Sequence, residues 1–176
     1  MKKILFVFAS IVLLGLAGST AFVVYTANQP DGSIEATTNS AEAETPPPTP
    51  EELLRLVNDE RAKVGVAPLV IDENVQKAAQ LKADDFASRD YYSHAIKGSE
   101  YILTPEMDSL ISTMCTTGNE NINNNIQTSA QAVSSWINSP SHKETMLNAK
   151  YSKTGFGVSH DEGKYYFTVQ HFCVAK

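Results

Sequence analysis

The last apolar segment of the chain, residues 164–172, restricts the architecture more sharply than any other part of the sequence. Alternate residues of a β-strand point to opposite faces of a sheet, and here both alternating sets are bulky. A strand with two such faces belongs in a sheet that helices cover on both sides, so the sequence predicts a layered helix–sheet–helix domain. The two sets are Tyr165, Phe167, Val169 and His171 on one face, and Tyr166, Thr168, Gln170 and Phe172 on the other.

Helix-capping signals and apolar spacing predict four helices and a second strand. Residues that can cap a helix N-terminus stand at Thr49, Asp72, Thr104 and Thr128. The first two helices are expected to end at Gly65 and near residue 89. A strand over residues 154–159 is predicted to pair with the last one across a turn at residues 161–163. Residues 116–125 are rich in Asn and Thr, and are interpreted as a tight polar loop.

The chain divides into three parts. Residues 1–27 contain Lys2 and Lys3 followed by an apolar run of 24 residues, and are interpreted as a signal peptide or an N-terminal transmembrane anchor. Either interpretation places the rest of the chain outside the cytoplasm, membrane-anchored or secreted. Residues 28–50 are Pro-rich with one large aliphatic side chain, which predicts a disordered linker. Residues 51–176 remain as one folded domain.

The charge of the domain limits its partners. Residues 51–176 contain 12 Lys and Arg against 16 Asp and Glu, with no basic cluster. Nucleic acid is therefore not expected as a partner. The expected partners are the membrane, through the N-terminal segment, and an extracellular ligand or peptide.

The chain has two cysteines, Cys115 and Cys173, which lie 58 positions apart. In an exported domain such a pair predicts a disulfide bond. In the chain-entropy model this bond would stabilise the fold by about 4 kcal/mol. The alternative is a thiol nucleophile at Cys115 that uses one of the histidines as its base.

Three polar residues in separate segments, His94, Glu120 and His142, carry the functional question. Two imidazoles and a carboxylate that converge form a divalent-metal site or an acid–base site. Each also has a structural interpretation: His94 as a hydrogen-bonded group among aromatic residues, Glu120 as an acceptor of backbone N–H groups, and His142 as a solvated residue at a helix start. A helix start would keep His142 neutral, as metal binding requires. His160 and His171 are interpreted as surface and packing residues, respectively.

An ordered set of segments points to a family. These segments resemble the bacterial branch of the CAP superfamily, which includes cysteine-rich secretory, venom antigen and pathogenesis-related proteins with SCP-type domains. The resemblance implies an α+β fold, a three-layer α-β-α sandwich with a cleft lined by two His and usually two acidic residues. His94, Glu120 and His142 match three of these; the second acid would fall within residues 136–139, which contain no carboxylate. The segments are LVNDERAKVGVAPLVIDENVQKAAQLKADDFA, YYSHA, GNENI, AVSSWINSPSHKETMLNAKYSKTGFGV and YYFTVQHF.

Three functions follow from these observations. The first is a cell-surface module that binds a divalent metal, with zinc the best match, or another ligand through His94, His142 and Glu120. The second is a metal-assisted, peptidase-like hydrolase with Glu120 as the candidate base. The third is a non-catalytic lipid-binding or protein-interaction module, in which residues 101–103 would line a groove. The lack of a credible nucleophile and of the second acid argues against catalysis.

Overall fold

The computed structural model describes residues 45–160, 163 and 165–176, so the predicted signal or anchor segment and residues 28–44 of the predicted linker lie outside the described residues. Within the described part, no helix is long and apolar enough to cross a membrane. One mixed sheet has the strand order β1-β3-β4-β2, with β1 parallel to β3 and the other pairs antiparallel. The elements, in chain order, are α1 (Pro50–Lys63), β1 (Val70–Ile71), α2 (Glu73–Arg89), α3 (Pro105–Ile111), β2 (Cys115–Ile126), α4 (Ser129–Asn138), α5 (Pro140–Met146), β3 (Lys153–His160) and β4 (Tyr166–Ala175).

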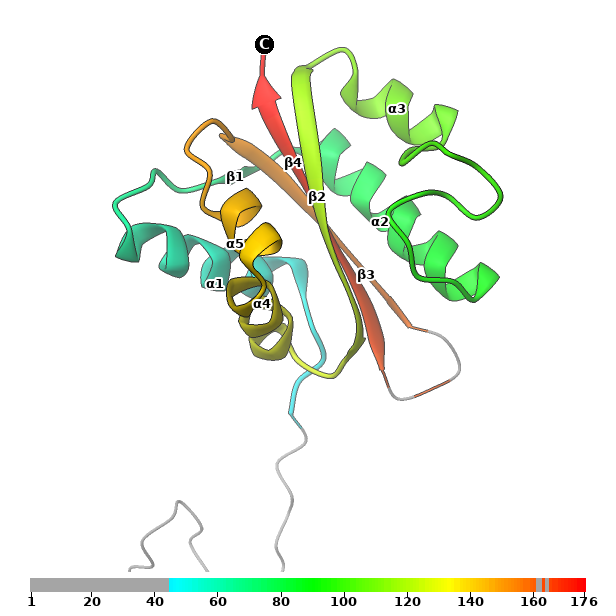
Figure 1. The fold of residues 1–176 in the computed structure, drawn as a ribbon, viewed down its shortest axis with the longest axis horizontal. Coiled ribbons are helices and arrows are strands. Elements are labelled where there is room, and N and C mark those ends of the chain that lie inside the picture. The colour runs from blue at the N-terminus through cyan, green and yellow to red at the C-terminus, as the bar shows by residue number, and fades with distance from the viewer. Residues whose placement is uncertain (1–44, 161–162, 164) are drawn as a thin grey trace, which may run out of the picture. The chain divides into compact units, whose positions relative to one another are not determined.

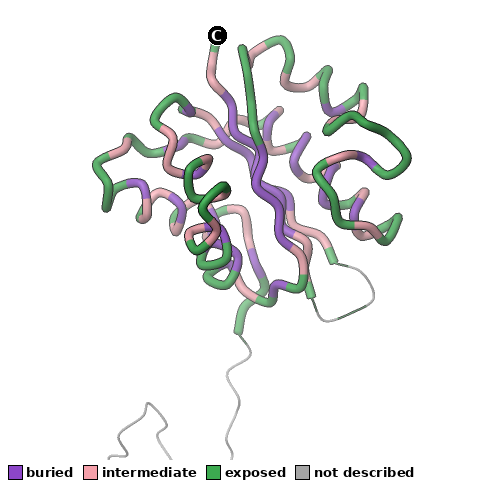
Figure 2. The backbone as a smooth tube through the Cα atoms, viewed as in Figure 1, coloured by how far each residue is buried: buried purple, intermediate pink, exposed green. Residues whose placement is uncertain are grey.

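Helices cover both faces of the sheet, which confirms the three-layer α-β-α sandwich (Figure 1). Helices α2 and α3 lie on one side, and α1, α4 and α5 lie on the other. The alternating faces of β4 enter different hydrophobic clusters: Phe172 packs with Trp136 and Leu53, whereas Val169 packs with Phe86 and Ile122. The buried strands run between the two helix layers (Figure 2). The two bulky faces of the last strand therefore have the predicted role.

The predicted helix starts are confirmed. Thr49, Asp72, Thr104 and Thr128 cap α1, α2, α3 and α4, and each side chain accepts a backbone N–H from the first turn. Helix α5 begins at Pro140, directly after α4 ends. These starts depend on residues within one turn of the cap, which explains why they can be predicted locally.

Strand β2 is the main correction to the sequence interpretation. Its twelve residues occupy the segment interpreted as a polar loop, and they pair with β4. The polar character is explained by buried amides: Asn121 Nδ2 donates to the His142 carbonyl, and Asn123 Nδ2 donates to the Ala132 carbonyl. A polar segment thus forms a buried strand because the helices beside it satisfy its side chains.

The disulfide between Cys115 and Cys173 is present, as predicted, with a Cα–Cα distance of 5.4 Å. It joins the start of β2 to β4. Because both sulfurs are in this bond, the alternative of a Cys115 thiol nucleophile is wrong for this structure.

Helix α2 packs directly on the backbone of β3. A Cβ atom at Gly155 or Gly157 would overlap the α2 backbone, so glycine is required for this close approach. The Gln76 side chain exchanges two hydrogen bonds with the backbone of Phe156, and Gln80 does the same with Val158. These contacts fix helix α2 against the sheet. They also satisfy backbone groups on the edge of β3, past the segment that pairs with β1.

A buried arginine fixes the segment that follows α5. Arg61, on α1, has no exposed surface, and its guanidinium donates to four backbone carbonyls. This network holds the end of α5, the helix that carries His142, against α1. The carbonyls belong to Ala67, Met146, Asn148 and Tyr151.

Candidate functional site

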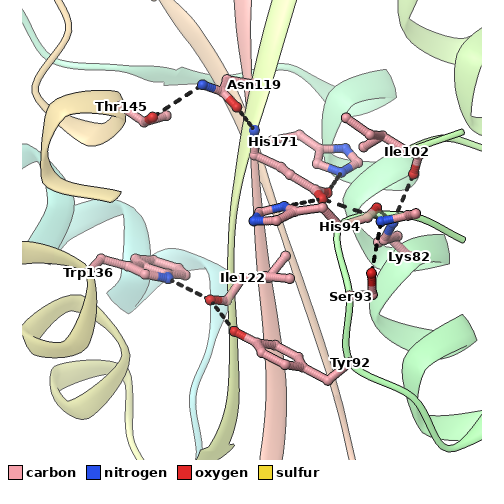
Figure 3. A network of polar contacts seen from close by, with 12 residues as sticks. Lys82, Tyr92, Ser93, His94, Ile102, Asn119, Ile122, Trp136, Thr145 and His171 are labelled. Atoms are coloured by element: carbon pink, nitrogen blue, oxygen red, sulfur yellow. Dashed lines mark hydrogen bonds and ion pairs between the residues drawn. The ribbon is translucent and has the colours of Figure 1, made fainter. Parts of the chain in front are cut away.

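Glu120 lies at the centre of the candidate site. It is a buried residue of β2, and its Cα is directly opposite that of His171 on β4. Its Oε1 atom is 2.7 Å from His94 Nδ1, and its Oε2 atom is 3.2 Å from His171 Nε2 (Figure 3). An ionised carboxylate only accepts hydrogen bonds, so both ring nitrogens donate to it. Glu120 thereby fixes the orientation of two histidines from different parts of the chain.

Lys82 holds the loop that carries His94. This loop, residues 90–104, connects α2 to α3 and is called the cleft loop below. The Lys82 side chain is fully buried, and its Nζ donates to the carbonyls of His94, at 2.5 Å, and Ile102, at 2.8 Å. The same Nζ is 4.0 Å from Glu120 Oε1. One ammonium group therefore ties the cleft loop to the carboxylate (Figure 3).

The electrostatics of the site favour an ionised Glu120. Burial opposes ionisation, but the hydrogen bonds from His171 and His94 and the nearby positive charges outweigh it, so the pKa of Glu120 is below its usual value. The pKa of His94 is raised, chiefly by its hydrogen bond to Glu120. Burial lowers the pKa of Lys82, while the charge of Glu120 opposes that change. The carboxylate is therefore charged at neutral pH and stabilises the protonated forms of His94 and Lys82.

His142 enters the site from the opposite helix layer. It lies on α5, and Asn121 Nδ2 holds its carbonyl at 3.0 Å. Burial lowers the pKa of His142, and the charge of His94 lowers it further. A helix dipole was expected to keep His142 neutral, whereas burial is the main cause in the structure. His94 and His142 lie on elements on opposite sides of β2, the cleft loop and α5 (Figure 1).

The structure therefore brings His94 and Glu120 into direct contact, whereas the pKa of His142 is affected by the charge of His94. It adds His171 and Lys82, which the sequence argument left out of the site. His171 was interpreted as a packing residue, and is in fact a second partner of the carboxylate. Among the described residues, no group of three or more His, Cys, Asp or Glu side chains is arranged to hold a metal ion. The prediction that Glu120 and both histidines bind one metal together stays a prediction.

A cavity of about 660 Å³ lies between α3 and β2, beside Glu120 and His171. Its walls include Ile102, Leu103 and Ile111. Residues 102 and 103 thus line a hollow as the sequence suggested, whereas the neighbouring tyrosine at 101 is 77% exposed and is not part of the lining.

Comparison with known proteins assigns the family. Residues 54–172 match the profile of the cysteine-rich secretory protein family, CAP. The chain belongs to the CAP family. A similar curated protein is the uncharacterized protein YkwD of Bacillus subtilis, which is 31% identical over 107 residues, or 61% of this chain and 41% of YkwD. The chain spans less than half the length of the curated relatives that it matches.

Solved structures share the CAP fold. An outer surface protein from Borrelia burgdorferi aligns with a TM-score of 0.63 and 23% identity, over 72% of this chain and 92% of that one. NaASP2, solved with Zn²⁺, aligns with a TM-score of 0.51 and 14% identity, over 69% of this chain and 77% of that one. These likenesses establish the fold, and relatives of this CAP domain include surface proteins.

Proposed function

We propose that this CAP domain acts outside the cytoplasm as a divalent-cation-binding module, with His94 and His142 as the ligating residues. The observation that carries the proposal is the 2.7 Å contact between His94 Nδ1 and Glu120 Oε1. With the proton on Nδ1, a neutral His94 has its lone pair on Nε2, the form that binds a metal ion. The His94 side chain is 53% exposed, so this nitrogen can reach a cation in the cleft.

Glu120 fits the role of an outer partner better than that of a ligand. Both of its oxygens already accept hydrogen bonds from histidines, and the carboxylate is almost fully buried. A carboxylate that accepts from a ligating imidazole fixes the ring and raises its basicity. This arrangement supports the outer-partner alternative that the sequence left open.

Zinc is the cation that the donor set suits best, because it favours imidazole nitrogen and tetrahedral coordination. NaASP2, a protein of the same fold, was crystallised with this ion. Two histidines leave coordination positions for water or for a ligand from outside, and a bound cation would polarise such a ligand as a Lewis acid. The donor set therefore supports reversible binding of an external group.

Hydrolysis is less well supported. Glu120, the candidate base, is engaged by His94 and His171, and its lowered pKa makes it a weak base. The second acid that the family cleft usually contains is absent from residues 136–139. A binding role requires neither a proton-accepting Glu120 nor a second acid.

Export of the domain is part of the proposal. It rests on the apolar run that follows Lys2 and Lys3. Mass spectrometry of the protein purified from its native cells distinguishes the two forms. An intact N-terminus in the membrane fraction would indicate an anchor, and a start near residue 22 would indicate a cleaved signal peptide and secretion.

Zinc titration calorimetry of the full-length protein tests the cation site. His94→Ala and His142→Ala should each weaken binding by at least about tenfold, and Glu120→Gln should weaken it by about tenfold. The matched control is His160→Ala, an exposed histidine at the end of β3, which should bind as wild type does. Circular dichroism verifies that each variant is folded. Equal zinc affinity in wild type and in the double variant lacking His94 and His142 would disprove the proposal.

A further inference from the structure

The first half of β2, Cys115–Glu120, has an edge that pairs with no other strand in the described part of the chain, and is called the free edge below. In the sheet order, β2 is a terminal strand and pairs with β4 alone. Residues 116–119 are exposed, and the half-strand lies in front of β4, between the two helix layers (Figures 1 and 2). Edge strands usually carry a Lys, a Pro or a covering segment. The sequence CTTGNE has neither residue.

Two other segments along the edges of this sheet are satisfied by side chains. On β3, Gln76 and Gln80 hydrogen-bond the backbone beyond β1. Farther along β2, the Ile122 carbonyl accepts from Tyr92 Oη at 2.8 Å and from Trp136 Nε1 at 3.3 Å (Figure 3). Protection of β2 by the cleft loop and α4 therefore begins at Ile122, and within the free edge Asn119 Oδ1 satisfies the N–H of Glu120.

The backbone direction along the free edge follows from the same contacts. The Ile122 carbonyl and the Glu120 N–H, which donates to Asn119 Oδ1 at 2.9 Å, both point away from β4. Alternate residues of an edge strand share this direction, so the N–H and C=O of Gly118 also point outward. In the described part of the chain, Gly118 forms no hydrogen bond outside the ladder between β2 and β4. A donor and an acceptor therefore face solvent at the same residue.

The cavity between α3 and β2 adjoins this edge. Every residue from Cys115 to Glu120 lines it, together with Ile102, Leu103 and Ile111 across from the strand. Its volume, about 660 Å³, is more than a single large side chain requires. A chain lying on the free edge would direct alternate side chains toward this cavity.

We propose that the free edge binds an extended peptide as an additional β-strand, with a large apolar side chain of the peptide in the cavity. A peptide backbone supplies both the acceptor for the Gly118 N–H and the donor for its C=O, at the spacing that strand addition requires. A lipid chain would leave these two groups unpaired. A second copy of this protein would bring its own free edge, which has no large apolar side chain to fill the cavity.

This surface meets the proposed cation site at Glu120, but it contains neither of the proposed ligands and does not require a bound ion. The free edge ends at Glu120, whereas His94 and His142 come from the cleft loop and α5. Peptide binding should therefore persist in EDTA and in the His94→Ala, His142→Ala double variant. This condition separates the two proposals, since either can fail without the other.

The probe for the test is a phage-displayed library of random nonapeptides, selected on the full-length protein in detergent. The best selected peptide is then synthesised with an N-methyl group at each position in turn. Strand addition uses alternate N–H groups of the peptide, so methylation should weaken binding about tenfold at every second position and little between them. An absence of enriched peptides, or a loss of affinity without this period of two, would overturn the proposal.

A matched pair of variants tests the cavity. Ser112 is exposed and lines the cavity, and Thr113 is exposed and does not line it. Ser112→Trp should weaken the selected peptide at least about tenfold by filling the cavity, while Thr113→Trp should bind it as wild type does. Equal binding by both variants would contradict the cavity's role. Loss of peptide binding in EDTA would assign the peptide's site to the cation. A stable dimer that excludes the peptide, detected by light scattering, would assign this surface to a second copy. Either result would overturn the proposal.

Discussion

Replacement of Lys82 by methionine should destabilise the domain through the cleft loop. The substitution keeps the length of the side chain but removes the ammonium group that donates to the carbonyls of His94 and Ile102. Each carbonyl that loses its donor costs about 1 kcal/mol or more. The buried carboxylate of Glu120 also loses a cation at 4.0 Å, which is partly offset because the ammonium no longer has to be desolvated.

The net loss in the free energy of unfolding should be about 3 kcal/mol, equivalent to a fall in Tm of about 10 °C for a domain of this size. Thermal and urea unfolding of the full-length protein, followed by circular dichroism, measure it. Lys77→Met is the matched control, because Lys77 is an exposed residue of the same helix; it should change stability by less than about 0.5 kcal/mol. Equal stability of the two variants would refute the structural role assigned to Lys82.

Four further results are expected. Glu120→Gln should lower the pKa of His94 toward its ordinary value, because the hydrogen bond to the carboxylate is the main cause of the raised pKa. NMR titration of the His94 ring measures this pKa. An unchanged value would be evidence against the contact between His94 and Glu120. The pKa of His94 is raised on folding, so the stability that its protonation contributes is complete below about pH 6.5 and is lost as pH rises through the folded pKa. Urea unfolding at several pH values should show this loss in wild type and a smaller loss in Glu120→Gln. Gly157→Ala should destabilise by about 3 kcal/mol in denaturant unfolding, because its Cβ would overlap the backbone of α2; a loss below about 1 kcal/mol would mean that the helix can move away at little cost. Replacement of Cys115 and Cys173 by alanine should reduce stability by about 4 kcal/mol, and labelling of denatured, unreduced wild type should find no free thiol; two labelled thiols per chain would contradict the bond.

The features that could be predicted from the sequence depend on local chemistry or on strong alternation. Thr49, Asp72, Thr104 and Thr128 identified the helix starts because a cap is formed within one turn. The alternation in residues 164–172 identified a sheet covered on both faces. The cysteine pair was predicted because an exported domain favours oxidation, without any knowledge of the fold.

Strand β2 was missed because most of its buried positions are polar. Asn121 and Asn123 do not show the apolar alternation of a strand, and the side chains that satisfy them become visible only in the tertiary structure. Without β2, the register that places Glu120 opposite His171 could not be inferred. Lys82 was missed for a related reason: a lysine at a core position of α2 has meaning only when the carbonyls that it binds are known.

Crystallography at the zinc absorption edge tests the cation site most directly. In crystals of the full-length protein grown with Zn²⁺, one strong anomalous peak should lie about 2.1 Å from a ring nitrogen of both His94 and His142. Glu120 should still be bonded to His94 Nδ1 and should not contact the ion. A peak bound by the Glu120 carboxylate without His142, or the absence of a peak between the two histidines, would contradict the two-histidine site.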